Sequence, residues 1–246
     1  MNNHIPKFTY IIPFRYSPDK ILNLKRIVEW VSGYQGVEVI IVEQDRHSKI
    51  SHLTIRATHI FMKSNGSFNK SLAYNFALKR VSSPVVVFGD CNTIMNPLEL
   101  IECLKSLDGF DCVIPSRDVT MLSQIESTGD FNNILSIKRS IPKLNMTDGI
   151  SIFKRSSIIG IGGWCEDIVG DSFENKFQDF KISKMLKVNN KEYSQFQLFH
   201  QINNTDNGAE DRYNKIINPL KSINIEQMRQ YLSSTIPKIG IKNKYF

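Results

Sequence analysis

The sequence predicts an α/β protein built on an open, mostly parallel, twisted sheet that is flanked by helices and followed by a C-terminal extension. Short apolar, β-branched runs alternate with segments in which apolar residues recur every three or four positions. Several of these runs are apolar throughout, which is typical of strands buried on both faces. Polar residues follow the early strands, at the edge where open α/β sheets bind ligands.

The N-terminal part forms a strand–helix–strand unit. Residues 8–13 predict a strand that proline ends, and 18–32 predict a helix whose apolar positions share one face. A second buried strand, 37–42, follows a glycine-containing turn. This is a βαβ unit, and its crossover is expected to be right-handed.

The same alternation continues along the chain. Further strands are expected at 60–62, 84–88, 111–115, 150–153 and 195–200. Further helices are expected at 68–80, 97–107, 154–161, 179–186 and 226–232. Between 116 and 146 the periodicity fades, which indicates a functional loop or a small insertion.

Composition and charge bound the class of protein. The chain has 246 residues, 41% of them hydrophobic, enough for one large soluble α/β domain or a domain with an appendage. No apolar stretch approaches the ~20 residues that cross a bilayer, and the start lacks a signal peptide's apolar segment. We therefore expect a cytoplasmic location, in the host cytoplasm for a viral chain. The four cysteines lack C-x-x-C spacing, which argues against structural zinc.

The net charge of +7 favours anionic partners such as a nucleotide, a nucleic acid or an acidic membrane surface. The most basic stretch, 238–246, mixes lysine with aromatic residues and suits nucleic acid or lipid headgroups, although a frayed end is the commoner explanation. We divide the chain into a domain over 1–200 and a helical extension with a basic tail over 201–246.

The most informative segment is the end of the strand at 85–88. It runs into Gly89, Asp90, Cys91 and Asn92. The Asp and the Asn can turn oxygens toward one hard cation, which usually keeps several waters and bridges to phosphate. Both residue types are also common in turns, so a plain turn is the alternative.

The order of motifs resembles nucleotide-sugar glycosyltransferases of the GT-A fold, a Rossmann-like α/β fold. The likeness is to the family 2 and family 7 type, which includes chondroitin-polymerase and β-1,4-galactosyltransferase domains. It covers about residues 8 to 200. The matching segments are IPFR at 12–15, IVEQ at 41–44, FNKSLAYN at 68–75, DCN at 90–92, DGISIF at 148–153, IGGW at 161–164, FQDFKIS at 177–183 and a late histidine at 200.

The resemblance implies transfer of a sugar from a nucleoside-diphosphate sugar, with UDP as the expected nucleotide, with inversion and with Mn²⁺ or Mg²⁺ as cofactor. The implied metal ligands are Asp90, Asn92 and His200. The implied base is Asp179, with Glu174 or Asp171 as alternatives. The implied donor- or acceptor-site contacts are Pro13, Phe14, Arg15, Glu43, Gln44, Asn69, Asp90, Gly149 and Trp164.

Two departures weaken these assignments. Asn92 replaces the second acid of the family's D-x-D, and Gln178 replaces the Glu of its Glu-Asp pair. Each site residue also has a structural alternative. Asp179 would interact with a helix dipole, Asn69 would cap a helix, Trp164 would pack in the core, His200 would be structural and Arg15 would be a surface cation.

The acceptor is open between two classes. Most relatives of this type glycosylate glycans, whereas the high pI keeps open a modified base in viral DNA, which would need extrusion from the duplex. A peripheral membrane contact is also open. Two other functions compete with transfer: a nucleotidyltransferase, against which 13–18 lacks the expected glycine-rich loop, and an inert nucleotide-sugar-binding module.

Overall fold

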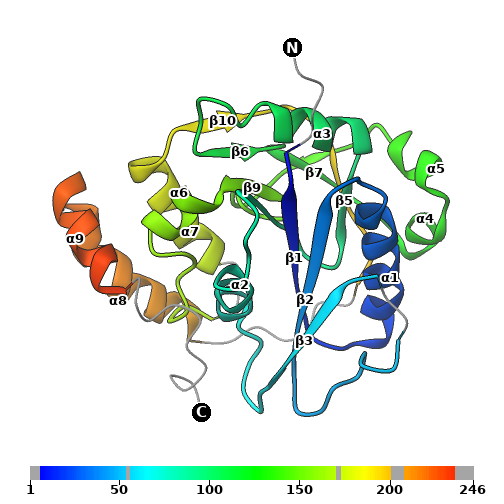
Figure 1. The fold of residues 1–246 in the computed structure, drawn as a ribbon, viewed down its shortest axis with the longest axis horizontal. Helices are drawn as coiled ribbons and strands as arrows, with labels where there is room; N and C mark the ends of the chain where they lie inside the picture. Colours follow the sequence, from blue (N-terminus) through cyan, green and yellow to red (C-terminus); the bar gives the residue numbers. More distant parts are fainter. Residues whose placement is uncertain (1–5, 54–55, 170–172, 201–207, 236–246) are drawn as a thin grey trace.

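The computed structural model describes residues 6–53, 56–169, 173–200 and 208–235. A seven-stranded sheet in the order β10-β6-β9-β4-β1-β2-β3 forms its centre (Figure 1). Every neighbouring pair is parallel except the two that include β9. The expected open, mostly parallel sheet is thus confirmed. Its strands are β1 (Phe8–Phe14), β2 (Val37–Asp45), β3 (Thr58–Lys63), β4 (Val85–Phe88), β6 (Cys112–Ile114), β9 (Ser151–Lys154) and β10 (Val188–Asn190).

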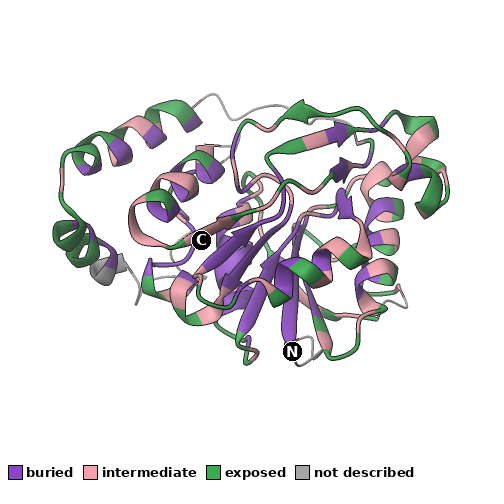
Figure 2. Ribbon diagram, turned by 90° about the horizontal axis from the view of Figure 1, so that it is seen from above, coloured by how far each residue is buried: buried purple, intermediate pink, exposed green. Residues whose placement is uncertain are grey.

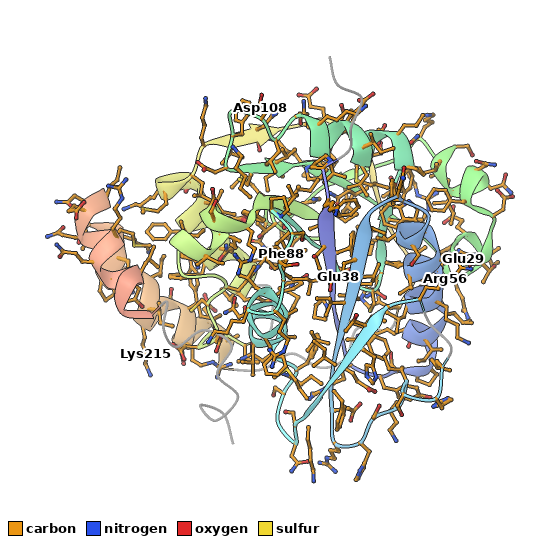
Figure 3. The ribbon with its side chains drawn as sticks, in the orientation of Figure 1. Glu29, Glu38, Arg56, Phe88, Asp108 and Lys215 are labelled. Carbon is orange, nitrogen blue, oxygen red and sulfur yellow. The ribbon has the colours of Figure 1, made fainter. Side chains whose placement is uncertain are left out.

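The central strands are buried on both faces, as their mostly apolar sequences predicted. Alternate side chains of β1 enter different cores: Tyr10 and Ile12 pack into one cluster, and Ile11 packs into the other. Phe88, the last residue of β4, lies at the centre of the molecule, whereas Asp108 and Lys215 lie at its periphery (Figure 3).

Helices cover both faces of this sheet, and the buried strands lie between them (Figure 2). One core joins the sheet to α1 (Pro18–Ser32) and α3 (Pro97–Lys105). The other joins it to α2 (Lys70–Leu78), α6 (Arg155–Gly160) and α7 (Phe173–Met185).

Residues 116–146, expected to be a loop or small insertion, contain four short elements. These are β7 (Asp118–Met121), α4 (Gln124–Thr128), α5 (Phe131–Leu135) and β8 (Ile141–Pro142). They escaped prediction because α4 buries no residue and α5 buries one, so neither shows apolar periodicity. β7 and β8 join β5 (Thr93–Met95) and β11 (Gln195–Gln197) in a second sheet of order β5-β11-β7-β8.

Two helices follow the sheet domain, α8 (Ala209–Lys221) and α9 (Ile225–Thr235), and they lie beyond α7 in Figure 1. Their buried Tyr213, Ile217 and Met228 belong to the same apolar cluster as α7. The sequence predicted α9 but not α8, in which Pro219 interrupts the helical pattern. None of the helices within the described ranges has the length and apolar character to cross a membrane.

Candidate active site

The loop after β4 begins with a glycine that the packing requires. A Cβ on Gly89 would lie 2.0 Å from the hydroxyl of Tyr10, so no larger residue fits without a shift. Asp90 then turns back, and its Oδ1 accepts a hydrogen bond from the backbone N–H of Asn92 at 2.8 Å. The Asp therefore closes a turn, as the alternative interpretation expected, and it also lines the cleft described next.

A cleft of about 400 Å³ lies where the loop after β4, the second sheet and the start of α7 meet. Charged and polar residues from distant parts of the chain line it: Lys70, Asp90, Thr93, Lys143, Asp148, Gly149, Asn175, Gln195 and Gln197. Apolar residues of β7, of β8 and of the segment after β8 line it as well: Val119, Met121, Ile141, Pro142 and Leu144. Of the residues predicted from sequence, the lining includes Asp90 and Gly149.

Lys70 brings a partly buried positive charge into this cleft from the first turn of α2. Its Nζ lies 3.3 Å from Oε1 of Glu174. Burial acts to lower the pKa of Lys70, but attraction by Glu174, Asp148 and Asp90 outweighs it and the pKa is raised. The lysine therefore remains a cation at neutral pH, with three carboxylates around it.

A second lysine lines the same cleft. Lys143 donates from Nζ to the backbone carbonyl of Asp148 at 2.7 Å. Burial lowers its pKa to about 8, against the opposing attraction of Asp148, Asp90, Asp179 and Asp118. Asp90 and Asp148 line the same cleft, and their negative charges would repel an anionic ligand. The two lysines supply the positive charge that offsets this repulsion.

Asp148 is held in place by amide groups. Its Oδ2 accepts from the backbone N–H of Asn145 at 2.9 Å and from the Asn145 side chain at 3.2 Å. Its Oδ1 accepts from Nδ2 of Asn175, in the first turn of α7. Gly149 follows with φ +79°, and a Cβ there would lie 2.4 Å from Oε1 of Gln195. A carboxylate is thereby fixed at the cleft wall.

The predicted donor contacts at the first two strand tips form a separate network. Arg15 donates from Nε to the carbonyl of Gln44 at 2.9 Å, and its guanidinium lies 5.7 Å from the Phe68 ring centroid. The side chain of Gln44 accepts from the backbone N–H of Asn69 at 2.6 Å. Asn69 caps α2 by accepting from Leu72, as its structural alternative predicted. This network fixes the helix end that carries Lys70.

Glu43 is fully buried and holds the loop after β2. It accepts hydrogen bonds from the hydroxyl of Ser48 at 2.7 Å and the backbone N–H of Lys49 at 2.6 Å, and it pairs with His59 at 2.9 Å. Pro13 and Phe14 are buried in β1. In this structure the three residues support the strand tips and do not line the cleft.

The candidate bases have different surroundings. Asp179 accepts three hydrogen bonds, from the backbone N–H groups of Met146 and Thr147 and from the Thr147 hydroxyl. Burial raises its pKa, and these hydrogen bonds oppose the rise. Asp179 thus anchors the loop before Asp148 and is not among the residues lining the cleft. Glu174 pairs with Lys70, and Asp171 lies outside the described residues.

The residues predicted to hold a metal fit that role unevenly. Asp90 offers a carboxylate to the cleft. Asn92 is 7% exposed, and its Oδ1 accepts from Nδ2 of Asn23 at 3.1 Å. The ring of His200 contacts the carbonyl of Leu198 at 3.2 Å. Among the described residues, no three His, Cys, Asp or Glu side chains are grouped closely enough to hold a metal ion.

Trp164 lies in the core rather than at a ligand surface. It is 2% exposed, and its ring packs against Tyr74 and Phe88 at centroid distances of 4.8 and 5.5 Å. Asn75 holds its backbone by accepting from the Trp164 N–H and donating to its carbonyl, both at 2.8 Å. Two roles were weighed for Trp164, stacking on an acceptor sugar and packing in the core; in this structure the ring packs in the core.

Among the lining residues not singled out from the sequence, those used below are Lys70, Lys143, Asp148 and Asn175. Lys70 is next to Asn69 and Asp148 is next to Gly149, and both of these neighbours were singled out. Position within the motif could therefore have indicated Lys70 and Asp148. Lys143 and Asn175 carried no local signal, because the packing of α7 and of the segment after β8 brings them to the cleft.

No protein-family model and no curated protein matches this sequence. Solved structures do match. Staphylococcus aureus TarS, residues 1–349, matches with a TM-score of 0.58 at 14% identity. The match covers 94% of this chain and 70% of the TarS chain. The catalytic domain of Drosophila β1,4-galactosyltransferase 7, solved with xylobiose, matches with a TM-score of 0.53 at 13% identity. The match covers 83% of this chain and 69% of the galactosyltransferase chain.

A third match is the mannosyltransferase PcManGT from Pyrobaculum calidifontis, solved with GDP-Man and Mn²⁺. Its TM-score is 0.53 at 14% identity, and the match covers 98% of this chain and 74% of that one. These three proteins are glycosyltransferases that share the sheet and flanking helices described above. At these identities the likeness establishes architecture. The chain has the fold of the GT-A glycosyltransferases, as the order of its sequence motifs predicted.

Proposed function

We propose that the protein is a glycosyltransferase that moves a sugar from a nucleoside-diphosphate donor, UDP being the first to test, to a hydroxyl acceptor with inversion. The observation that carries this proposal is the cleft at the tip of β4, where Lys70 and Lys143 lie beside Asp90. Departure of a diphosphate develops negative charge, which fixed cations offset best where water is limited. The GT-A fold supports this choice over other phosphate chemistry.

Lys70 and Lys143 would hold the diphosphate. Lys70 is neutralised by carboxylates in the free protein, so an entering diphosphate competes with Glu174, Asp148 and Asp90 for it. Arg15, Gln44 and Asn69 adjoin α2 and would contact the nucleoside or position the lysine.

Asp90 would hold Mn²⁺ or Mg²⁺. Such an ion supplies charge that stabilises the leaving diphosphate when it is bound. Oxygen ligands from the diphosphate and from water would complete its coordination, because protein ligands other than Asp90 are poorly presented. Asn92 and His200 would join only if their present hydrogen bonds to Asn23 and Leu198 changed.

A glycan is the acceptor that the cleft supports best. Its outer wall carries Met121, Ile141 and Leu144, which are 45%, 54% and 90% exposed. Apolar side chains suit the C–H faces of sugars, whereas a duplex would require basic contacts along its phosphates. A modified DNA base is the alternative, and salt-sensitive duplex binding would favour it.

The test is a panel of UDP-, GDP- and dTDP-sugars incubated with Mn²⁺ and mixed glycan acceptors, with products read by mass spectrometry. We expect one nucleoside diphosphate to be released and to raise the melting temperature in a thermal-shift assay. Asp90→Ala should abolish the Mn²⁺-dependent part of that shift, and Asp108→Ala, at the periphery, serves as its control (Figure 3). Stabilisation without turnover of any donor would indicate the inert binding module instead.

A further inference from the structure

We infer that Asp148 is the general base of the transfer and that Asn175 is its positioning residue. This assignment rests on the proposed function and replaces Asp179 and Glu174 in that role. Asp148 and Asn175 both line the cleft that contains Asp90 and Lys70. A base must lie within hydrogen-bond reach of the proton that it removes, so a carboxylate at the cleft wall meets the first requirement.

The two competing acids fail this geometric requirement in different ways. Asp179 accepts its three hydrogen bonds from Met146 and Thr147, which hold it against the loop outside the cleft lining. Glu174 is 7% exposed and gives one oxygen to Lys70. Neither Asp179 nor Glu174 lines the cleft, whereas Asp148 does.

Asn175 supplies orientation. Its Nδ2 donates to Oδ1 of Asp148, while Asn145 donates twice to Oδ2. Asn175 is 2% exposed, and its Oδ1 has no protein partner. A buried, unpartnered carbonyl oxygen beside the carboxylate is an acceptor for a substrate hydroxyl. Asn175 would therefore bind the acceptor and hold the base at once.

The step balances without another reactant. The acceptor oxygen bonds to the anomeric carbon while its proton passes to a carboxylate oxygen of Asp148. The bond from that carbon to the β-phosphate oxygen breaks, and its electron pair leaves with the diphosphate. Lys70, already close to Asp148, offsets charge on the same side of the cleft.

The test compares Asp148→Asn with Asp179→Asn and Glu174→Gln. For Asp148→Asn we expect transfer to fall about 10²–10⁴-fold, while UDP with Mn²⁺ still raises the melting temperature as in the wild type. Formate should restore transfer to Asp148→Ala, because a small carboxylate replaces the missing one, and should not restore Asp179→Ala. Asn175→Ala should lower kcat for transfer and raise KM for the acceptor while leaving KM for the donor unchanged, because it removes the contacts that orient Asp148 and meet the acceptor but none to the diphosphate.

Two results would overturn the assignment alone. One is an Asp148→Asn protein whose transfer stays within a few-fold of wild type. The other is loss of the UDP–Mn²⁺ thermal shift in that variant, which would make Asp148 a donor or metal ligand. A wild-type protein that binds UDP but transfers no sugar would instead overturn the proposed function, and the assignment with it.

Discussion

The side-chain amide of Asn23, in α1, donates to Oδ1 of Asn92 at 3.1 Å and to the carbonyl of Phe199 at 3.0 Å. Asn92 also accepts, through its backbone carbonyl, the N–H of Leu198 at 2.7 Å. The residue that replaces the second acid of the D-x-D motif thus joins α1, the loop after β4 and the segment after β11. Its amide oxygen serves the fold at a position where the motif would place a metal ligand.

Asn92→Asp should strengthen divalent-cation binding. The new carboxylate adds charge beside Asp90, and Asn23 can still donate to it. We expect the Mn²⁺ concentration for half of the UDP-dependent thermal shift to fall about tenfold, which corresponds to about 1.4 kcal/mol. Asn96→Asp, the same change at the N-cap of α3, should leave the Mn²⁺ requirement unchanged. Equal Mn²⁺ requirements in Asn92→Asp and wild type would show that this position does not face the cation.

Donor binding should weaken as the pH rises through 8. Lys143 has a pKa lowered to about 8 by burial, so it loses its charge above that pH, whereas Lys70, with its raised pKa, keeps its own. Calorimetric titration with UDP should show affinity falling up to about tenfold between about pH 7 and 9. Lys143→Met should bind UDP more weakly throughout and with a flatter pH dependence. The same pH dependence in both proteins would assign the titration to another group.

Lys143 should also make the free energy of unfolding depend on pH, and here the effect rises with pH whereas donor binding falls. Its pKa in the folded protein lies below the ordinary 10.5, so the unfolded chain binds more protons between these values. Its contribution to the free energy of unfolding therefore rises with pH across that window. Urea titrations at two pH values in this window give the free energy of unfolding of the wild type minus that of Lys143→Met. We expect this difference to be larger at the higher pH.

The Lys70–Glu174 pair should stabilise the fold and separate the roles of its members. Removing one partner of a buried pair costs about 3–5 kcal/mol, and Glu174→Gln should cost less than this because Lys70 keeps Asp148 and Asp90 nearby. Lys70→Met should abolish UDP binding, whereas Glu174→Gln should retain it. A double-mutant cycle in urea measures the pair's coupling energy. More than about 10²-fold loss of transfer in a folded Glu174→Gln protein would return Glu174 to the role of base.

Gly149→Ala should lower the free energy of unfolding by more than the cost of a positive φ angle alone. A φ of +79° costs a non-glycine residue about 1–2 kcal/mol, and the added Cβ would also meet Gln195 and Thr93 at 2.4 and 3.0 Å. Gly109→Ala, with φ +73° and no atom within 4 Å, measures the angle alone. Gly160→Ala, within α6 and in open space, should be neutral or stabilising by about 0.4–1 kcal/mol. Equal losses at 149 and 109 would mean that the cleft wall relaxes.

Trp164→Ala should lower the free energy of unfolding by about 3–5 kcal/mol, because its ring fills space between Tyr74 and Phe88. Trp164→Phe should lose less, since it keeps an aromatic ring in that space. Urea denaturation checks both. A folded Trp164→Ala protein of nearly wild-type stability, with only a raised KM for the acceptor, would favour the sugar-stacking role instead.

Local patterning predicted the sheet well for a physical reason. Strands such as β1 and β4 are buried on both faces, and mostly apolar runs fill such positions. The amphipathic spacing of α1 likewise predicted its bounds, 18–32. Elements that bury little left no such signal, and α4, held by the capping pair Ser123 and Glu126, was accordingly missed.

The site was harder to predict because the sequence around a polar side chain does not show which groups it will contact in the fold. Glu43 and Asp90 both come after apolar runs in the sequence, yet the first is buried beneath a loop while the second lines the cleft. Asp148 and Asp179 differ in the same way, since the packing of α7 turns one toward the cleft and binds the other to a loop.

By itself, then, the sequence determined the order of strands and helices and placed Asp90 at a strand tip, because burial and periodicity act on neighbouring residues. The tertiary structure alone decided which charges meet. Lys70, Asp148 and Asn175 come from separate segments, and the approach of α2, α7 and the loop before β9 brings them to one cleft. Charges separated along the chain interact only once packing has fixed the distances between them.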